Sequence, residues 1–353
     1  MLQAALLLFL AFLSQAFACT GMLLKSPNNE IVTGRTVEFG VNLDISLAVI
    51  PRNFSFVGKV PGGNGLKYTS KYAVVGCYCF DDPVVMDGIN EMGLVAAAFY
   101  FPGYAEYAQV AKSNQASALS PVEFPNWILT QFATIEEVRE GIDSVCIAPT
   151  VLPGWGNSPP PMHYIVYDRS GNSLVIEPIN GTFSVYENPI GVITNSPTFD
   201  WHMTNLCNFI NLSPYDAETV RMRSIPLSPF GQGSGMVGLP GDFTPPSRFV
   251  RAALFSTLAV PTEKLINQTF HLLNQFDIPL GSVRERAQKK PYYDFTLCTT
   301  VKDPKFLKYY YKSYENQSVQ FVDLSQFDFN AKKIKSLKMS GEEKPLDISS
   351  QLR

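Results

Sequence analysis

Strand-like runs of apolar residues recur at both ends of the chain, and the clearest helical patterns lie between them. The strand-like runs are residues 19–26, 30–40, 71–80 and 93–101, then 162–178, 182–189 and 190–197, and finally 293–303, 305–315 and 318–325. The helical runs are 120–145, 247–260 and 263–276. Strands grouped apart from helices predict antiparallel sheets, whereas strict strand–helix alternation would predict a parallel sheet. We therefore expect an α+β fold in a single domain.

Local signals define several of these elements more closely. Residues 168–172 interrupt the run at 162–178 with Asp-Arg-Ser-Gly-Asn and predict a hairpin there. Thr134 and Glu137 have the spacing of a capping box, which predicts a helix start. The polar segment 87–93 lies between two apolar runs, and we interpret it as their connection.

Charge and hydropathy exclude two classes of partner. The formal net charge is −3, and the only basic run is 331–338, which is typical of a solvated tail. Binding to nucleic acid needs lysine and arginine clustered over one face, so no nucleic-acid partner is expected. No segment after residue 18 reaches 18 consecutive apolar residues, so no membrane span is expected either.

The first 18 residues have the features of a cleaved secretory signal. They contain no charged side chain, Leu6 to Phe12 is apolar, and residues 16–18 read Ala-Phe-Ala, the small-x-small pattern of a cleavage site. The apolar run is too short to span a bilayer. We predict a signal peptide at 1–18 and a mature chain at 19–353. That chain would be secreted, periplasmic or in the lumen of the secretory pathway.

Cysteine and glycine patterns give no sign of a metal or a nucleotide. Neither the six cysteines nor the three histidines are spaced as zinc ligands, so neither a metal nor another cofactor is expected. Cys77 and Cys79 would point to the same side of a strand and are poorly placed to pair. Residues 233–238 read G-x-G-x-x-G but follow a proline-bearing segment, so we interpret them as a loop.

Cys19 follows the predicted cleavage site directly. Cleavage after Ala18 would give Cys19 a thiol and a free α-amine on one residue. An α-amine has a pKa of about 7.7 to 8.0, so near neutral pH it can accept the thiol proton and return it to a leaving amine. Such a residue supplies nucleophile and base together and needs no histidine partner. Two alternatives remain open, a lipoprotein acylated on this cysteine and a cysteine that merely begins a strand.

Five segments after Cys19 carry a family resemblance. They read GRTVEFG, DGINEMGLVAAAFYFPGYAEY, GVITNSPTFDWHMTNL, GLPGDFTPPSRFVRAAL and YYDFTLCTTVKDPKFLKYYYKSYEN. In this order and spacing they resemble the choloylglycine hydrolase family, which includes bile salt hydrolases and penicillin V acylases. The resemblance runs from Cys19 to about Phe327. It implies the N-terminal nucleophile hydrolase fold, a four-layer αββα sandwich of two antiparallel sheets flanked by helices, as one catalytic domain over 19–353.

The resemblance also implies roles for residues of the first, second and fourth strand-like runs. Cys19 would be the nucleophile and, through its amine, the base. Arg35 would lie beside the thiolate, and Glu38 would orient the amine from a position where family members commonly carry aspartate. Tyr100 would donate its backbone N–H to the oxyanion of the intermediate.

Two further residues complete the implied site. Asn195 would direct its side-chain N–H at the oxyanion, and Arg248 would be a second active-site arginine. Without the resemblance, the two would be interpreted as a turn asparagine and a surface residue near a helix start.

The implied substrate is a small-molecule acyl amide. Tyr100 stands where penicillin V acylases carry tyrosine and bile salt hydrolases carry asparagine, so the pocket is expected to suit an apolar or aromatic acyl group. Conjugated bile salts and N-acyl homoserine lactones are the alternatives. A catalytically silent ligand-binding protein, secreted or lipid-anchored, is the non-enzymatic alternative, because Glu38 departs from the family pattern. The resemblance also suggests a homotetramer.

Overall fold

Two large antiparallel sheets lie face to face in the computed structural model, which describes residues 18–40, 43–79, 83–153, 155–285, 292–339 and 341–352. The predicted signal peptide lies outside these residues except for Ala18. The first sheet has the order β1-β2-β17-β18-β19, with β16 paired to β17. Its strands are β1 (Cys19–Lys25), β2 (Ile31–Phe39), β16 (Val283–Glu285), β17 (Tyr292–Asp303), β18 (Lys308–Ser313) and β19 (Gln320–Asp323).

The second sheet has eight strands in the order β13-β12-β11-β8-β7-β6-β3-β20. Its strands are β3 (Ser46–Ile50), β6 (Val74–Tyr78), β7 (Asp87–Asn90), β8 (Val95–Tyr100), β11 (Met162–Tyr167), β12 (Ser173–Ile179), β13 (Thr182–Glu187) and β20 (Lys335–Lys338). Strands β7, β8 and β11 are buried along their whole length. Strands that are covered on both faces favour continuous apolar runs, which explains the pattern of β8, whereas β7 is buried although it reads Asp-Gly-Ile-Asn.

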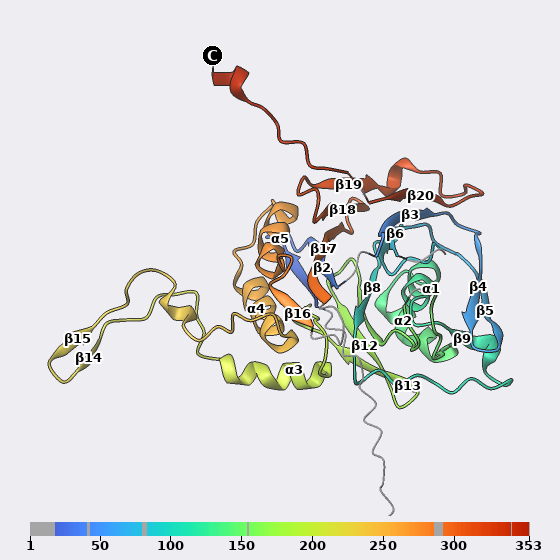
Figure 1. Cartoon of the computed structure of the whole chain (residues 1–353), viewed down its shortest axis with the longest axis horizontal. Helices are drawn as coiled ribbons and strands as arrows, with labels where there is room; N and C mark the ends of the chain where they lie inside the picture. The colour runs from blue at the N-terminus through green and yellow to red at the C-terminus, as the bar shows by residue number, and fades with distance from the viewer. Residues whose placement is uncertain are drawn as a thin grey trace, which may run out of the picture.

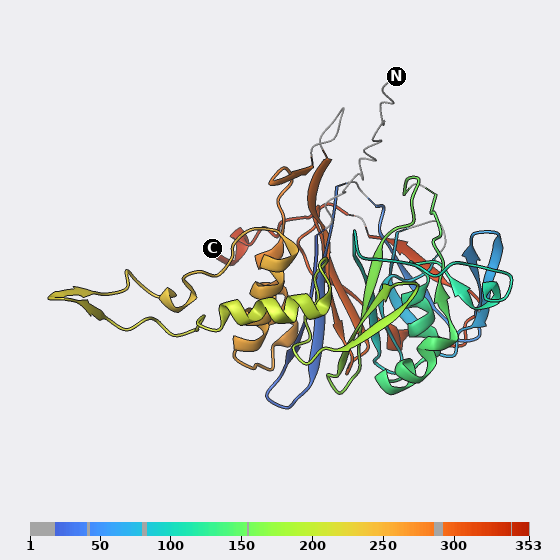
Figure 2. The ribbon, with the colours of Figure 1, turned by 90° about the horizontal axis from the view of Figure 1, so that it is seen from below.

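Helices cover the outer face of each sheet (Figures 1 and 2). Helix α4 (Pro245–Leu258) packs against β1, α5 (Leu265–Leu273) packs against β2 and β17, and α1 (Phe124–Gln131) packs against β7 and β8. The layers therefore run helix, sheet, sheet, helix, which confirms the predicted αββα sandwich. The remaining elements are α2 (Ile135–Gly141), α3 (Phe199–Leu206), β4 (Ser55–Val60), β5 (Gly63–Thr69), β9 (Ala118–Leu119), β10 (Cys146–Ile147), β14 (Val220–Met222) and β15 (Ile225–Leu227).

Most local signals led to the predicted structure. The Thr134 side chain accepts a hydrogen bond from the backbone N–H of Glu137 at 3.2 Å and caps α2. The hairpin around 168–172 forms between β11 and β12. The three C-terminal runs form the predicted meander β17-β18-β19.

Three local predictions were wrong or incomplete, and one helix was missed. Segment 87–93 is not only a connection, because its first half is the buried strand β7. Segment 190–197 is not a strand and makes only a single bridge, Ile193 to Gly21 of β1. Helix α3 was missed. The basic run at 331–338 is not simply a solvated tail, because it contains β20, which pairs with β3 and leaves its side chains exposed.

Residues 207–243, here called the arm, project from the body of the protein (yellow in Figures 1 and 2). The arm carries the small β14–β15 hairpin and two short turns of 3-10 helix, Cys207–Phe209 and Ser234–Met236. The G-x-G-x-x-G match falls on the second turn. Both hairpin strands are exposed throughout. The arm thus adds no layer to the fold.

Candidate active site

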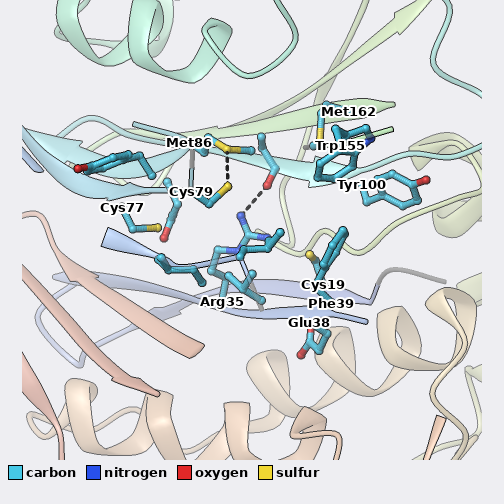
Figure 3. A pocket seen from close by; sticks show the side chains of 16 residues that line it. Cys19, Arg35, Glu38, Phe39, Cys77, Cys79, Met86, Tyr100, Trp155 and Met162 are labelled. Atoms are coloured by element: carbon cyan, nitrogen blue, oxygen red, sulfur yellow. Dashed lines mark hydrogen bonds between the residues drawn. The ribbon is translucent and has the colours of Figure 1, made fainter. Parts of the chain in front are cut away.

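Cys19 begins strand β1 and lines a pocket between the two sheets. Its side chain is only 6% exposed, and its Cα pairs with that of Val37 on β2. The pocket encloses about 610 Å³ including its open mouth. Figure 3 shows the cysteine between Arg35 on one side and the aromatic side chains on the other. The apolar part of the lining includes Phe39, Leu43, Ile45, Met86, Tyr100, Trp155 and Met162.

Arg35 lies on the same face of the sheet as the Cys19 side chain. Residues alternate along a strand, so Arg35, two positions from the Cys19 partner Val37, points into the space between the sheets. Its guanidinium donates a hydrogen bond to the Ala98 carbonyl of β8 at 2.5 Å and stacks on Phe99 at 3.9 Å. Burial raises the pKa of the Cys19 thiol, and the positive charge of Arg35 opposes this rise.

Asn195 contacts the Cys19 backbone directly. The backbone N–H of Cys19 donates to the Asn195 side-chain oxygen at 2.9 Å, and the Asn195 side-chain nitrogen donates to the Tyr100 carbonyl at 2.8 Å. The bridge between Ile193 and Gly21 brings this loop to β1. A Cβ on Gly21 would lie 2.7 Å from the Phe99 ring and 2.9 Å from the Ile193 side chain, so only glycine permits the approach.

Two buried histidines hold the backbone around Asn195. Burial lowers the pKa of His202 to about 4, so its ring is neutral, and its Nε2 lies 2.8 Å from the Asn195 carbonyl oxygen. The His163 Nε2 lies 3.1 Å from the Thr194 carbonyl oxygen. These contacts fix the backbone from which the Asn195 side chain extends. Nothing in the sequence pattern indicated them.

Arg248 lies in the first turn of α4 and is fully buried. It donates hydrogen bonds to the Cys19 carbonyl, to the Thr20 hydroxyl at 2.9 Å and to the Asn195 side-chain oxygen at 2.6 Å. Burial lowers its pKa to about 10, so the guanidinium remains charged near neutral pH. Arg248 therefore fixes both ends of the contact between Cys19 and Asn195, and it is not the surface residue that its position alone suggested.

Glu38 lies on the opposite face of β2, toward the helices (Figure 3). It is 1% exposed, and one carboxylate oxygen accepts from the Thr296 hydroxyl at 3.3 Å. The other oxygen has no hydrogen-bond partner among the described residues. Burial raises the pKa of Glu38 to about 8, against the opposing charge of Arg248. A cation placed nearby would lower this pKa and favour the carboxylate form of Glu38.

The backbone at residues 18 and 19 continues the sheet. The Glu38 backbone N–H donates to the Ala18 carbonyl at 3.1 Å, so Ala18 extends the β1–β2 ladder. Cys19 N is here a peptide nitrogen, which has no basic lone pair. A cut between Ala18 and Cys19 would convert it into an amine within the reach of Asn195.

Tyr100, the last residue of β8, contributes to the pocket wall. Its ring centroid lies 6.2 Å from that of Trp155, whose ring in turn lies 5.3 Å from that of Phe39. The six residues singled out in the sequence thus lie in one region, with Cys19, Arg35 and Tyr100 facing the pocket. Within the described ranges, no three side chains of His, Cys, Asp or Glu gather as a metal site would require.

Comparison with known proteins assigns the family. The model of the choloylglycine hydrolase family of linear amide C–N hydrolases matches residues 19–337. The chain belongs to this family.

Individual relatives agree with the assignment. A bile salt hydrolase/transferase of Clostridium perfringens is 35% identical over 91% of this chain and 96% of its own. A penicillin V acylase of Pectobacterium atrosepticum is 25% identical over 89% of this chain and 83% of its own. The crystal structure of a mutant conjugated bile acid hydrolase from C. perfringens covers 94% of this chain and 100% of that one, with a TM-score of 0.84 at 32% identity.

Membership in the choloylglycine hydrolase family makes the chain an amidohydrolase that acts on non-peptide C–N bonds. In the part of the chain that the structure describes, no helix is long and apolar enough to cross a membrane. The six cysteines are all unpaired thiols; Cys77 and Cys298 are buried like Cys19, and Cys207 is exposed.

Two charged residues close to the pocket were missed in the sequence. Asp87 lines the pocket and was interpreted as part of a polar connection. Lys302 is 2% exposed and pairs with Asp87. A signal for Lys302 was available, because it alternates with Cys298 and Thr300 on the inward face of a long strand-like run, where a lysine needs a buried partner.

Proposed function

We propose that this chain is exported, cut after Ala18, and then hydrolyses an amide that carries an apolar, aromatic acyl group. The observation that supports this most is that Cys19 lines a pocket whose walls are mainly apolar and aromatic. Apolar pockets select ligands by burying matching apolar surface. Tyr100 and Trp155 would contact the acyl group while its carbonyl lies against the sulfur.

The proposed reaction uses the free amine of mature Cys19. The amine accepts the thiol proton, and the thiolate attacks the amide carbonyl carbon to form a C–S bond. Asn195 and the Tyr100 backbone stabilise the oxyanion, an effect worth about 3 to 4 kcal/mol for one well-placed donor. The amine then returns its proton to the leaving nitrogen as the C–N bond breaks, and water hydrolyses the thioester to release the acid.

Glu38 would hold the ammonium form of this amine. Its unpartnered oxygen is buried close to the start of β1, where a carboxylate gains from a neighbouring cation. In the uncut chain the Asn195 side-chain nitrogen is bonded to the Tyr100 carbonyl, so the oxyanion role requires this amide to exchange that contact for the substrate oxygen.

A substrate panel tests the proposal. Mature protein beginning at Cys19 would be assayed with penicillin V, glycocholate, taurocholate and an N-acyl homoserine lactone at equal concentrations. We expect the highest kcat/KM for penicillin V, whose acyl group is aromatic. Conjugated bile salts are the second candidate, because the bile salt hydrolase of C. perfringens is more similar to this chain than the penicillin V acylase is. A preference for either cholate conjugate would replace the proposal by that candidate.

Export is tested by the N-terminus itself. Intact mass and N-terminal sequencing of the protein recovered from a secretory host should give a chain that begins with unmodified Cys19. The uncharged residues 1–18 support this expectation. A chain cut elsewhere, or a lipid on the Cys19 thiol, would leave no free thiol and amine on one residue and would refute the mechanism.

The arm supports the homotetramer that the family resemblance implies. Its exposed apolar side chains include those of Ile210, Met222, Ile225 and Phe230, and Phe230 is fully exposed. An isolated two-stranded hairpin is marginally stable in water, and exposed apolar clusters mark protein interfaces. We propose that another copy of this chain covers the arm.

A further inference from the structure

A buried ion pair joins the two sheets behind the pocket. Lys302 on β17 pairs with the Asp87 carboxylate on β7, and their side chains are 2% and 1% exposed. The second Asp87 oxygen accepts hydrogen bonds from the Thr300 hydroxyl at 2.7 Å and the Tyr309 hydroxyl at 2.8 Å. Lys302 also donates to the Thr300 hydroxyl at 2.7 Å. This pair does more than connect the sheets, because Asp87 also lines the pocket.

Asp87 is a second counter-charge for Arg35. Burial acts to lower the pKa of Arg35, yet the negative charges of Cys19 and then Asp87 hold it above its ordinary value. Burial acts to raise the pKa of Asp87, but Lys302 and then Arg35 hold it below its ordinary value. One aspartate thus lies within the electrostatic reach of two cations, and the stronger of its two interactions is with Lys302.

The charge count shows what Lys302 does for the pocket. Arg35 and Lys302 carry two positive charges, Asp87 carries one negative charge, and the Cys19 thiolate would supply the second. If Lys302 were neutral, Asp87 would compensate Arg35, and the field of the guanidinium at the sulfur would be largely cancelled. Charges at this depth are poorly screened, so this change in the pairing of Asp87 would alter the electrostatic potential at the Cys19 sulfur.

We propose that Lys302 is a positioning residue that binds the Asp87 carboxylate and thereby keeps the charge of Arg35 available to the Cys19 sulfur. The inference rests on the proposed role of Cys19 as nucleophile. Lys302 does not line the pocket itself, so it acts through Asp87 and Arg35.

The other ionisable groups around these residues are the same in every variant of the test below. Glu38 and Arg248 act on the Cys19 thiol beside Arg35, and Cys77 and Cys298 act on Arg35. Arg35 and Cys77 also act on Lys302, and Tyr167 lies within reach of both Arg35 and Asp87. The sign of each expected shift therefore follows from the charge that is removed.

Three variants of the mature protein test the charge balance. Lys302→Met leaves Asp87 to compensate Arg35, so the pKa of the Cys19 thiol should rise by about one unit, within the range for a nearby charge. Asp87→Asn leaves Lys302 unpaired and should lower the pKa of the Cys19 thiol. The double variant removes both charges and should return it close to the wild-type value. It also avoids an unpaired buried charge, the main cause of misfolding in the single variants.

The readout is the rate of Cys19 alkylation by iodoacetamide as a function of pH, followed by mass spectrometry of the N-terminal peptide. Only the thiolate reacts, so the midpoint reports the titration of the Cys19 thiol, coupled to that of its own α-amine, without any substrate. The amine is present in every variant, so differences between the midpoints report the removed charges. A failure of the proposed amidase activity would therefore leave this test readable. Peptide mapping separates Cys19 from the other five cysteines.

Lys312→Met is the matched control. Lys312 lies in β18 of the same sheet, is 6% exposed and pairs with Asp277 at 3.1 Å, but it does not line the pocket. It should lose stability as Lys302→Met does and leave the Cys19 midpoint unchanged. The proposal is overturned if the two single variants of the Asp87–Lys302 pair shift the midpoint in the same direction, or if neither shifts it relative to Lys312→Met.

Discussion

The pocket and the arm are stabilised in opposite ways. Around Cys19, the charged groups Arg35, Glu38 and Arg248 are each at most 5% exposed. Each contacts residues from another segment of the chain. In the arm, apolar side chains face solvent, and the polar contacts are local, such as Asp216 accepting hydrogen bonds from the backbone of Gly233 and Ser234 at 2.6 and 3.0 Å.

The difference shows where each region obtains its stability. The pocket places charges in a low dielectric, where an unpaired charge costs several kcal/mol and a paired one acts strongly on its neighbours. Its geometry is therefore set by the whole sandwich. The arm has no such constraint, so a change there should alter what the protein binds to and leave the chemistry intact.

The largest effect is expected from Cys19→Ala, which removes the proposed nucleophile from the pocket. Loss of a covalent nucleophile costs more than about 10⁴-fold in kcat. The change removes one sulfur from the surface of the pocket, so the fold should survive. Amide turnover and the thermal midpoint of unfolding measure the two consequences. Retained turnover would show that another group attacks the amide.

Asn195→Ala should reduce kcat by about 10²- to 10³-fold, because one oxyanion donor is lost. Substrate KM should change far less, since the oxyanion forms only during the reaction. Asn188→Ala is the matched control. Asn188 is also buried and donates to a backbone carbonyl, that of Val192 at 3.0 Å, in the same segment. Equal losses in the two variants would assign the effect of Asn195 to folding.

The pocket residues show how far the sequence could lead. The ordered motifs identify the family, so the αββα fold could be predicted, and they also indicated which residues lie together around Cys19. Their catalytic roles and the cut before Cys19 stay predictions. The partners of those residues could not, because each contact joins segments far apart in the chain. Lys302 and Asp87 lie on strands near opposite ends of the sequence, and His202 contacts Asn195 through a turn that was interpreted as a strand. Such contacts depend on how the sheets stack, which no local pattern encodes.

Glu38→Gln tests whether the buried charges of the pocket cost stability. In a chain that keeps Ala18, Glu38 has a pKa of about 8, above the ordinary value of 4.5. The folded state then binds more protons than the unfolded state between these values, so Glu38 lowers the free energy of unfolding as pH rises from about 4.5 to 8. Glu38→Gln should remove this fall. The difference in the free energy of unfolding between this variant and the wild type should therefore widen as the pH rises.

Urea unfolding at several pH values measures this difference in the free energy of unfolding, and a residue of the arm, Asp216, provides the control. Asp216 has a pKa below its ordinary value because it accepts backbone hydrogen bonds from Ser234 and Gly233, and it is fully exposed. It stays ionised from about pH 4.5 to 8 in both states. Asp216→Asn should therefore leave the pH dependence as it is. A flat wild-type profile would mean that Glu38 finds a compensating charge in the folded chain.

The smallest effect on catalysis is expected from the arm. Replacing Ile225 and Phe230 together by serine removes exposed apolar surface without touching a residue of the pocket. If another copy of the chain covers the arm, this variant should sediment as a smaller species. The kcat per chain should stay close to the wild-type value, since neither residue lines the pocket. Replacing Thr219 and Ser228, which contact each other on the hairpin at 2.9 Å, by alanine is the control and should keep the assembly.

A wild-type protein that sediments as a monomer would leave the apolar arm without the proposed partner. A serine variant that loses kcat together with assembly would show that the pocket depends on a neighbouring chain, and the contrast between the two regions would then fail.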